Sequence, residues 1–172
     1  IQYGVIKRPT HKRDSFAAAK KEICAHKWID IFDGTHGAAL MNDCKYGHRV
    51  WNSVLDIDLL RSSMYPGKDA DKGKHSFTYS FYVHNDDYVN QLTAEGYALN
   101  DPPKAFDGSV EEQLADKPLV ACEGEGVAVD WVKVAEDGNG VIVRYYNPTD
   151  EAQKVTIKAE GNTVTGSNIG IN

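Results

Sequence analysis

Two stretches near the end of the chain alternate apolar and polar residues on either side of a short turn sequence. Residues 127–135 read VAVDWVKVA, residues 141–146 read VIVRYY, and DGNG occupies 137–140 between them. A period of two is the pattern of a β-strand with two different faces. Asp, Asn and Gly tolerate the positive φ angles of hairpin turns. The pattern predicts an antiparallel hairpin and commits this region to a β fold.

Strand-like sequence also dominates the first hundred residues. We expect strands at 21–32, 36–41, 50–60 and 76–84, and further strands at 154–159 and from Thr163 onward. The first should place Ile23, Ala25, Lys27, Ile29 and Ile31 on one face, the third should be covered on both faces, and the fourth alternates Phe77, Tyr79, Phe81 and Val83 against Thr78, Ser80 and Tyr82. Only 14–21 and 86–99 favour helices, each with an acid at its start. The sequence therefore predicts an all-β chain, mainly an antiparallel sandwich, with one or two short helices.

A polar, acidic stretch divides these strands into two groups. Residues 104–117 follow two consecutive prolines, which can neither continue a helix nor enter a central strand. We expect a linker there, with one domain at 1–103 and a small sandwich at 118–172. A small sandwich needs more strands than 118–172 supplies, so its last strands are expected to be missing. Since the chain begins at Ile1, we also expect it to be part of a longer protein.

Charge and cysteine usage exclude several classes of partner. The formal charge is −6 and no dense Lys/Arg stripe is present, so we expect neither nucleic acid nor an anionic membrane as a partner. No apolar stretch approaches the roughly 18 residues of a membrane span. Cys24, Cys44 and Cys122 are odd in number and widely spaced. This usage favours a reducing compartment, and hence the cytoplasm.

Most groups that could carry chemistry have an ordinary explanation. The six histidines form none of the local spacings of a metal site, and we expect them to be polar or half-buried side chains, with no paired carboxylate for His26, His36 or His84. The DADKG sequence at 69–73 lacks calcium ligands at later positions, and the acids at 86–87 suit a helix start. Cys44 has Lys45 nearby but no signature of an oxyanion hole, so a nucleophilic role is disfavoured.

The sequence NDCKYG at 42–47 is the strongest site candidate. Asn42 and Asp43 can hydrogen-bond sugar hydroxyls, Lys45 adds a donor, and the face of Tyr46 can pack on the apolar side of a pyranose. A tight turn that Asn-Asp opens and Gly47 closes explains the same residues equally well. Both interpretations remain open from the residues alone.

A series of motifs in order closely resembles the C-terminal half of glycoside hydrolase family 38 α-mannosidases, in the bacterial and cytosolic branch. They are IQYGVIKRPTH (1–11), CAHKWIDI (24–31), GAALMNDCKYGH (37–48), NSVLDIDLLRSSMYP (52–66), ADKGKHSFTYSFYVH (70–84) and YALNDP (97–102), with GVIVRYYNPT (140–149) similar to the family's terminal β-sandwich. The resemblance implies part of a large galactose-mutarotase-like sandwich followed by part of a small one. Two departures concern the sites: MYPGKDADKGKH lacks the family's second proline and acid, and Trp51-Asn52 replaces a glycine-rich turn.

The resemblance also implies what lies elsewhere. In the family, a zinc ion held by His and Asp side chains and an Asp nucleophile belong to N-terminal domains, and no segment of this chain resembles these. The implied reaction of the whole enzyme is retaining hydrolysis of α-mannosides or oligosaccharides, with carboxylate attack and a carboxylic acid that protonates the leaving oxygen. We expect no catalytic residue, no cofactor and no activity in this chain alone, and the missing catalytic domain as its partner.

By the same resemblance, five residues are candidates for lining or buttressing the substrate cleft: Asn42, Asp43, Lys45, Tyr46 and Arg61. One alternative is a free-standing carbohydrate-binding module that uses an exposed ring such as Tyr46, Trp51 or Tyr65. Another is an oligomerisation domain, because unpaired edge strands favour pairing between chains and a homo-oligomer.

Overall fold

The computed structural model describes residues 2–11, 13–85, 89–105, 107–108, 120–124, 126–159 and 162–169. The chain divides into two compact units, the first centred on Ile6–Pro102 and the second on Pro103–Asn172 together with Tyr3–Val5. Most of the predicted linker at 104–117 lies outside the described residues.

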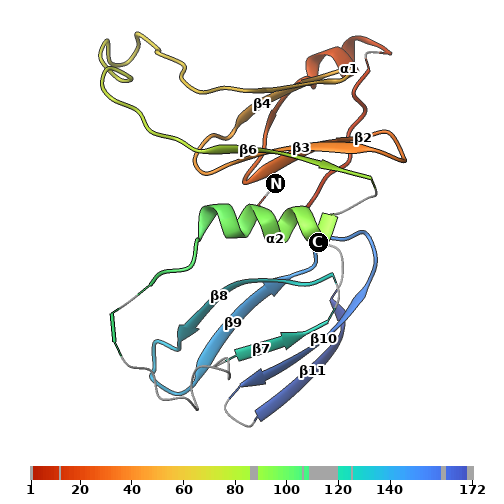
Figure 1. The fold of residues 1–172 in the computed structure, drawn as a ribbon, viewed down its shortest axis with the longest axis vertical. Coiled ribbons are helices and arrows are strands. Elements are labelled where there is room, and N and C mark those ends of the chain that lie inside the picture. Colours follow the sequence, from red (N-terminus) through yellow and green to blue (C-terminus); the bar gives the residue numbers. More distant parts are fainter. Residues whose placement is uncertain are drawn as a thin grey trace. The chain divides into compact units, whose positions relative to one another are not determined.

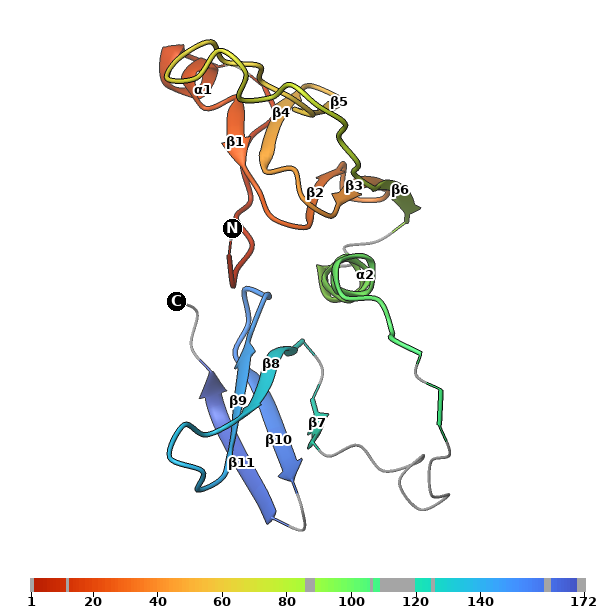
Figure 2. The ribbon, with the colours of Figure 1, turned by 90° about the vertical axis from the view of Figure 1, so that its left-hand side faces the viewer.

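The first unit contains two antiparallel three-stranded sheets. Its elements are α1 (Ser15–Ala19), β1 (Glu22–Cys24), β2 (Trp28–Phe32), β3 (Gly37–Asn42), β4 (Gly47–Trp51), β5 (Val54–Ile57), β6 (Tyr79–His84) and α2 (Val89–Asn100). One sheet has the order β1–β4–β5 and the other the order β2–β3–β6 (Figure 1). Figure 2 shows the two sheets as layers, with α2 on the side of β2–β3–β6 that faces away from β1–β4–β5.

The predicted single strand at 21–32 is wrong. It is two strands, β1 and β2, which belong to different sheets. Between them Lys27 has a φ of 68°, a left-handed conformation that breaks an extended strand. The Ala25 N–H, between the two strands, donates to the Tyr46 carbonyl just before β4 (3.0 Å). Alternation continues through the break in the sequence, so the pattern did not reveal that the chain crosses from one layer to the other.

The predicted strand at 50–60 is also wrong. The chain turns at Asn52, where φ is 51°, and folds back so that β4 pairs with β5. Across this hairpin the Arg49 Nε donates to Asp56 Oδ2 (2.7 Å). A hairpin explains the dense apolar sequence without a strand that is buried on both faces.

The core of the first unit lies between β3 and α2. Ala39, Met41 and Leu92 are buried together, and Trp28, Tyr82 and Leu99 pack around them. Gly96 brings α2 close to β2, because an added Cβ would lie 3.0 Å from Trp28 Cδ1. Both predicted helices are present within the described residues: α2 buries Leu92, Thr93 and Gly96, and Asp14, the acid expected at the start of α1, caps it by accepting from the Ala17 N–H (2.8 Å). The helix was predicted from 86, and residues 86–88 lie outside the described part.

The second unit confirms the predicted hairpin and adds a sheet to it. Its strands are β7 (Val120–Glu123), β8 (Ala128–Val134), β9 (Val141–Tyr146), β10 (Gln153–Ala159) and β11 (Asn162–Ile169). β8 pairs with β9 across the turn at 137–140, and β7–β10–β11 form an antiparallel sheet with Val155 fully buried. The expected fold class, mainly antiparallel β-sandwich with two short helices, is confirmed. Among the described helices, none has both the length and the apolar content needed to cross a membrane.

Candidate functional site

The turn at 42–48, which joins β3 to β4, is built around a buried amide. Asn42 is buried, its Oδ1 accepts from the Lys45 N–H (2.6 Å), and its Nδ2 lies 3.2 Å from His48 Nε2. The bond to Lys45 fixes which way the amide points, since only an oxygen can accept from that N–H. The NH₂ group of Asn42 therefore faces His48, and the side chain is used inside the protein.

His48 accepts the hydrogen bond of this amide as a neutral ring. Its Nδ1 lies 3.1 Å from the Tyr46 carbonyl oxygen, which can only accept, so the ring proton is on Nδ1 and Nε2 accepts from Asn42. Burial lowers the pKa of His48, against smaller opposing effects of the Tyr46 carbonyl and Asp58. A protonated ring would place Nε2–H against the Asn42 NH₂ group. Geometry and burial therefore both favour the uncharged form.

Asp43 connects the turn to the segment that enters β6. Its Oδ2 accepts from the Thr78 N–H (2.9 Å) and its own N–H donates to the Thr78 carbonyl (3.2 Å). The Cys44 thiol and these Thr78 contacts lower the pKa of Asp43. Oδ1 is buried, and no donor among the described residues lies at hydrogen-bond geometry to it. The same carboxylate raises the pKa of Cys44, which makes a thiolate nucleophile less accessible there.

Gly47 anchors the other end of the same long connection. The 58–78 segment joins β5 to β6; its Asp58 N–H donates to the Gly47 carbonyl (2.9 Å), and a Cβ on Gly47 would lie 2.8 Å from Asp58 Oδ2. The 42–48 turn thus fixes both ends, or roots, of this connection. Gly47 bonds Asp58 at its start, and Asp43 bonds Thr78 at its end. Sequence reasoning missed these partners because they lie far along the chain from the turn.

Arg61 belongs to this connection and not to the turn. It is exposed, three residues after the Asp58 root, and it makes no hydrogen bond or ion pair with the described residues. The structure therefore places four of the five predicted site residues in one turn. It places the fifth, Arg61, on the 58–78 connection, whose two ends hydrogen-bond to that turn.

Tyr46 and Lys45 are the two side chains of the turn whose chemistry suits contact with a ligand. Tyr46 is 53% exposed and its ring lies 4.8 Å from the His26 ring, while the half-buried Lys45 places Nζ 5.2 Å from the centre of the Phe77 ring. A supported tyrosine face beside an ammonium group suits a sugar, which offers both C–H and hydroxyl groups. Trp51 and Tyr65, the other suggested platforms, are also exposed, on β4 and on the 58–78 connection.

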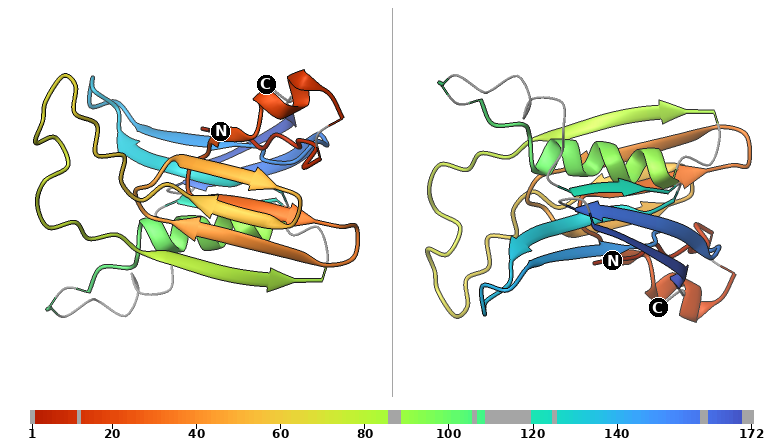
Figure 3. Two further views of the ribbon diagram at one scale, coloured as in Figure 1. Left: turned by 90° about the horizontal axis from the view of Figure 1, so that it is seen from above. Right: turned by 90° about the horizontal axis from the view of Figure 1, so that it is seen from below.

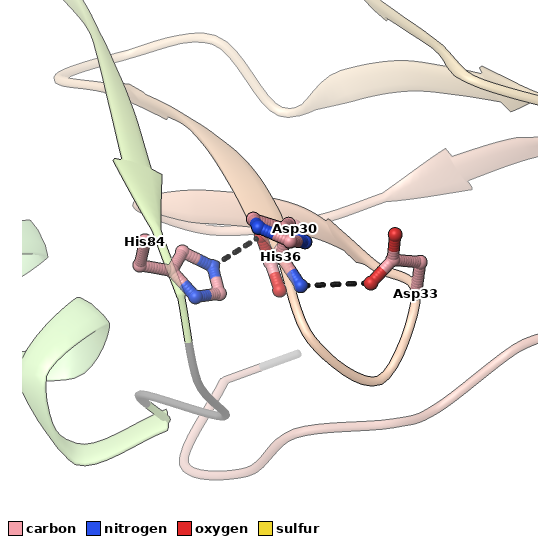
Figure 4. A network of polar contacts seen from close by, with 4 residues as sticks. All are labelled: Asp30, Asp33, His36 and His84. Carbon is pink, nitrogen blue, oxygen red and sulfur yellow. Dashed lines mark hydrogen bonds and ion pairs between the residues drawn. The ribbon is translucent and has the colours of Figure 1, made fainter.

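A second polar cluster lies on the β2–β3–β6 sheet and was not predicted (Figure 4). The His84 Nε2 lies 3.0 Å from Asp30 Oδ1, with side chains that are 1% and 17% exposed. The expectation that His84 has no paired carboxylate is therefore wrong. The ring crosses over β3 at Gly37, where a Cβ would lie 2.1 Å from His84 Cε1. A glycine inside a strand is the one sequence signal that could have indicated such a close approach.

Asp33 and His36 in the same figure form a surface turn between β2 and β3. Asp33 Oδ1 accepts from the His36 N–H (2.7 Å) and the Thr35 N–H (2.8 Å), and these two bonds are the main causes that lower the pKa of Asp33 to about 2. The His36 contact with Asp33 is through its backbone. We interpret this cluster as a turn that closes the strand pair.

The described residues do not fit a metal ion. Across them, no group of three His, Cys, Asp or Glu side chains is placed to hold one. The His84–Asp30 pair offers two groups that already bond each other. The zinc that the resemblance implies therefore has no set of ligands in the described part of this chain.

Comparison with known proteins identifies the architecture. The model of the glycosyl hydrolases family 38 C-terminal domain matches residues 1–69, and that of the family 38 C-terminal beta sandwich domain matches residues 126–169. The chain is 38% identical over 152 residues to alpha-mannosidase G of Dictyostelium discoideum and 33% identical over 150 residues to human alpha-mannosidase 2C1, each match covering 85% of the chain. It is 30% identical over 161 residues, 91% of the chain, to the alpha-mannosidase of Saccharomyces cerevisiae.

Two β units with these matches define a C-terminal β region of a glycoside hydrolase. The chain belongs to glycosyl hydrolase family 38. The matched stretch is 14% of the length of each of the three relatives, so the chain spans a small part of such a protein.

Proposed function

We propose that this chain is the C-terminal β region of a cytoplasmic α-mannosidase, where it supports a catalytic domain outside the chain and completes its substrate cleft. The observation that carries the proposal is the order of the two family models, at 1–69 and 126–169, within relatives that are named α-mannosidases. The three cysteines, all free, support the reducing compartment.

The catalytic groups belong, in this proposal, to the domain outside the chain. That domain would bind zinc and supply the nucleophilic carboxylate and the acid of a retaining hydrolysis of α-mannosides or oligosaccharides. Because the described residues offer no ligand set for zinc, no catalytic step is assigned to them. Their contribution is to hold and shape the edge of the cleft.

Within the cleft, the inner residues of the 42–48 turn support its structure and the outer residues contact the substrate. Asn42 and Asp43 are the buttress, since their side chains bond Lys45, His48 and Thr78. Lys45 and Tyr46 are the contacts with the leaving-group side of the sugar substrate. Arg61 adds a guanidinium from the connection that the turn anchors, and its lack of a partner among the described residues leaves it available to sugar hydroxyls.

The test uses the complete polypeptide that contains this chain and an aryl α-mannoside. Tyr46→Ala should raise KM about 2- to 10-fold with little change in kcat, because a ring that packs on the substrate contributes mainly to binding. The matched control is Phe16→Ala, which removes an exposed ring on α1. Equal kinetics for Tyr46→Ala and the parent protein would make the turn purely structural.

The isolated chain separates this proposal from its alternatives. With added zinc it should not hydrolyse the aryl mannoside, and reproducible turnover that Asp43→Ala abolishes would contradict the assignment. Calorimetric binding of mannosides by the isolated chain would favour a free-standing carbohydrate-binding module. A mass by light scattering that rises with concentration would favour an oligomerisation domain.

A further inference from the structure

The turn between β8 and β9 contains an asparagine that is followed by a glycine, Asn139-Gly140. A main-chain amide nitrogen can attack the side-chain carbonyl carbon of the asparagine before it, and this attack is the first step of deamidation. Glycine makes the attack easiest because it has no Cβ to obstruct the approach. Every other asparagine that has a residue after it precedes one with a side chain. The sequence therefore offers this reaction its least obstructed position at Asn139.

The structure leaves both reacting groups of this pair free. Asn139 and Gly140 are exposed, and a Cβ at Gly140 would meet nothing within 4 Å. The bonds of the turn use the Asn139 N–H, which donates to Asp137 Oδ1 (2.9 Å), and the Gly140 carbonyl, which accepts from the Ala135 N–H (2.9 Å). Within the described part of the chain, neither the Asn139 side chain nor the Gly140 N–H has a hydrogen-bond partner. The attacked carbon and the attacking nitrogen can therefore turn toward each other.

Two Asp-Gly pairs of the same chain show how such a pair can be protected. At 33–34 the carboxylate accepts two backbone N–H groups, which lower the pKa of Asp33 to about 2 and keep it ionised. An ionised carboxylate repels a nucleophile and offers no neutral leaving group. At 137–138 the attacking group is engaged, because the Gly138 N–H donates to the Ala135 carbonyl (2.9 Å). The asparagine pair has neither protection.

The hairpin tip, residues 136–140, is suited to water. Its sequence EDGNG holds two carboxylates, one amide and two glycines, and no apolar side chain. Figure 3 shows the tip as the end at which the chain reverses between β8 and β9, and the Glu136 side chain is 91% exposed beside Lys133. A neighbouring segment of a longer polypeptide would gain no apolar contact here and would have to desolvate two carboxylates. We therefore expect the hairpin tip to stay in contact with solvent in the complete protein.

We propose that Asn139 is a deamidation site, which reacts through a succinimide with Gly140 and needs no co-reactant other than water. The Gly140 nitrogen gives up its proton and bonds to Asn139 Cγ, while the bond from Cγ to the side-chain nitrogen breaks and that nitrogen leaves as ammonia. Water then opens the five-membered ring at either of its two carbonyl carbons. Opening at Cγ gives aspartate, and opening at the main-chain carbonyl gives isoaspartate. This modification does not depend on the mannosidase assignment.

Either product changes the hairpin. Both add a negative charge beside Asp137 and Glu136. Isoaspartate also routes the main chain through Cβ and Cγ of residue 139, which inserts one methylene between the two bonds that Asn139 and Gly140 make to the turn. It leaves a free α-carboxylate, the group that isoaspartyl methyltransferases methylate. The modified hairpin tip is thus a substrate for that class of enzyme.

The test incubates the folded, complete polypeptide at pH 8.5 in H₂¹⁸O and then digests it with trypsin in ordinary water. Cleavage after Lys133 and Arg144 releases residues 134–144 as one peptide. Deamidation during the incubation should raise the mass of this peptide by about 3 Da, of which the heavy oxygen contributes about 2 Da. The loss of Asn139 should be about tenfold faster than the loss of any other asparagine. An isoaspartyl methyltransferase with labelled S-adenosylmethionine should then label the same peptide.

The matched control is Asn139→Gln in the same polypeptide. The turn uses only the main chain of residue 139, so its bonds should be kept, and circular dichroism checks the fold. Attack on the longer side chain would have to close a six-membered ring, so both the mass gain and the methyl label should be lost from residues 134–144. A methyl label that persists there in Asn139→Gln would place the reaction at another residue and overturn the inference.

Three other results also decide against the inference. An unchanged 134–144 peptide from the folded protein would overturn it, and the free peptide of the same sequence, incubated beside it, shows whether the fold is the cause. A mass gain without methyl label would mean direct hydrolysis, in which Gly140 takes no part. Equal rates at Asn139 and at the exposed Asn52 would mean that the free glycine N–H does not select the site.

Discussion

The turns at 42–48 and 137–140 begin with the same local chemistry and end in different structural roles. In each, a side-chain oxygen accepts a backbone N–H just ahead: Asn42 from Lys45 (2.6 Å), and Asp137 from Asn139 (2.9 Å). At 137–140 the other backbone bonds are also local, between Ala135 and residues of the turn. This turn connects β8 to β9 and nothing more.

The 42–48 turn reaches segments far away in the sequence. The Asn42 N–H donates to the Lys27 carbonyl, and Asn100 Nδ2 at the end of α2 donates to the Asn42 carbonyl (3.0 Å). The bonds to Asp58 and Thr78 anchor the long connection. Turns with the same kind of local hydrogen bond can therefore be a simple reversal or a point at which several segments meet, and the second role depends on buried polar groups.

The largest effect should come from crowding a long-range polar contact. Gly37→Ala places a methyl group on the His84 ring and forces it away from Asp30. We expect a loss of roughly 3 kcal/mol in the opening free energy of β3 and β6, measured by amide hydrogen exchange, from overpacking plus a lost buried hydrogen bond. Gly67→Ala is the control, because its Cβ would meet nothing within 4 Å. Equal effects of the two changes would mean that the pair has no structural role.

The second-largest effect should come from removing the buried Asn42 amide of the 42–48 turn. Asn42→Ala leaves the Lys45 N–H and His48 Nε2 without their partner in a buried place. The opening free energy of β3 and β4 should fall by about 2 kcal/mol. At the hairpin turn, Asp137→Ala should cost β8 and β9 only about 0.5 kcal/mol, as is usual for exposed positions. A loss at Asp137 as large as that at Asn42 would remove the distinction between the two turns.

The same distinction explains what the sequence could predict. The hairpin of β8 and β9 was predicted closely because alternation and turn residues are local properties, and the cap of α1 at Asp14 is local too. The breaks at Lys27 and Asn52 were missed because apolar residues stand within two positions on either side of each. Left-handed backbone at Lys27 follows from tertiary contacts, whereas Asn52 is a residue type that tolerates it locally, and its turn signal was passed over.

The candidate site follows this rule as well. The sequence indicated that 42–47 was unusual, and a cluster of Asn, Asp, Lys and Tyr made both a turn and a sugar site plausible. It could not indicate that Asn42 is enclosed by His48, or that His84 reaches Asp30 across 54 residues, because neither contact has a spacing rule. Only Gly37 carried a trace of the second.

Acid should weaken the 42–48 turn more than the hairpin. The folded protein holds the pKa of His48 below its ordinary value of 6.5, so the unfolded chain binds more protons between the lowered pKa and 6.5. The stability that His48 contributes is therefore complete above about pH 6.5 and is lost as the pH falls through that window. Hydrogen exchange of β3 and β4 at pH 7.5 and 5.5, corrected for intrinsic rates, should show faster opening at the lower pH.

Two variants assign this pH effect. His48→Gln should reduce the dependence, and His11→Gln, at an exposed position outside the turn, should leave it unchanged. An unaltered slope in His48→Gln would assign the effect to another group, such as the His84–Asp30 pair.

The smallest effect should come from breaking the ion pair between Arg144 and Asp130 in the second unit. Arg144 Nε donates to Asp130 Oδ2 (2.6 Å) across β8 and β9, and its guanidinium lies 5.2 Å from the centre of the Tyr3 ring. Because the arginine side chain is 55% exposed, water and salt screen the pair, and Arg144→Gln should cost about 0.5 kcal/mol or slightly more. Hydrogen exchange of β8 and β9 in 0.05 and 0.5 M salt measures this, and the gap between variant and parent should shrink at high salt. A loss above about 2 kcal/mol that salt does not reduce would show that the second unit also depends on a shielded polar contact, and the contrast between the two units would then be one of position and not of kind.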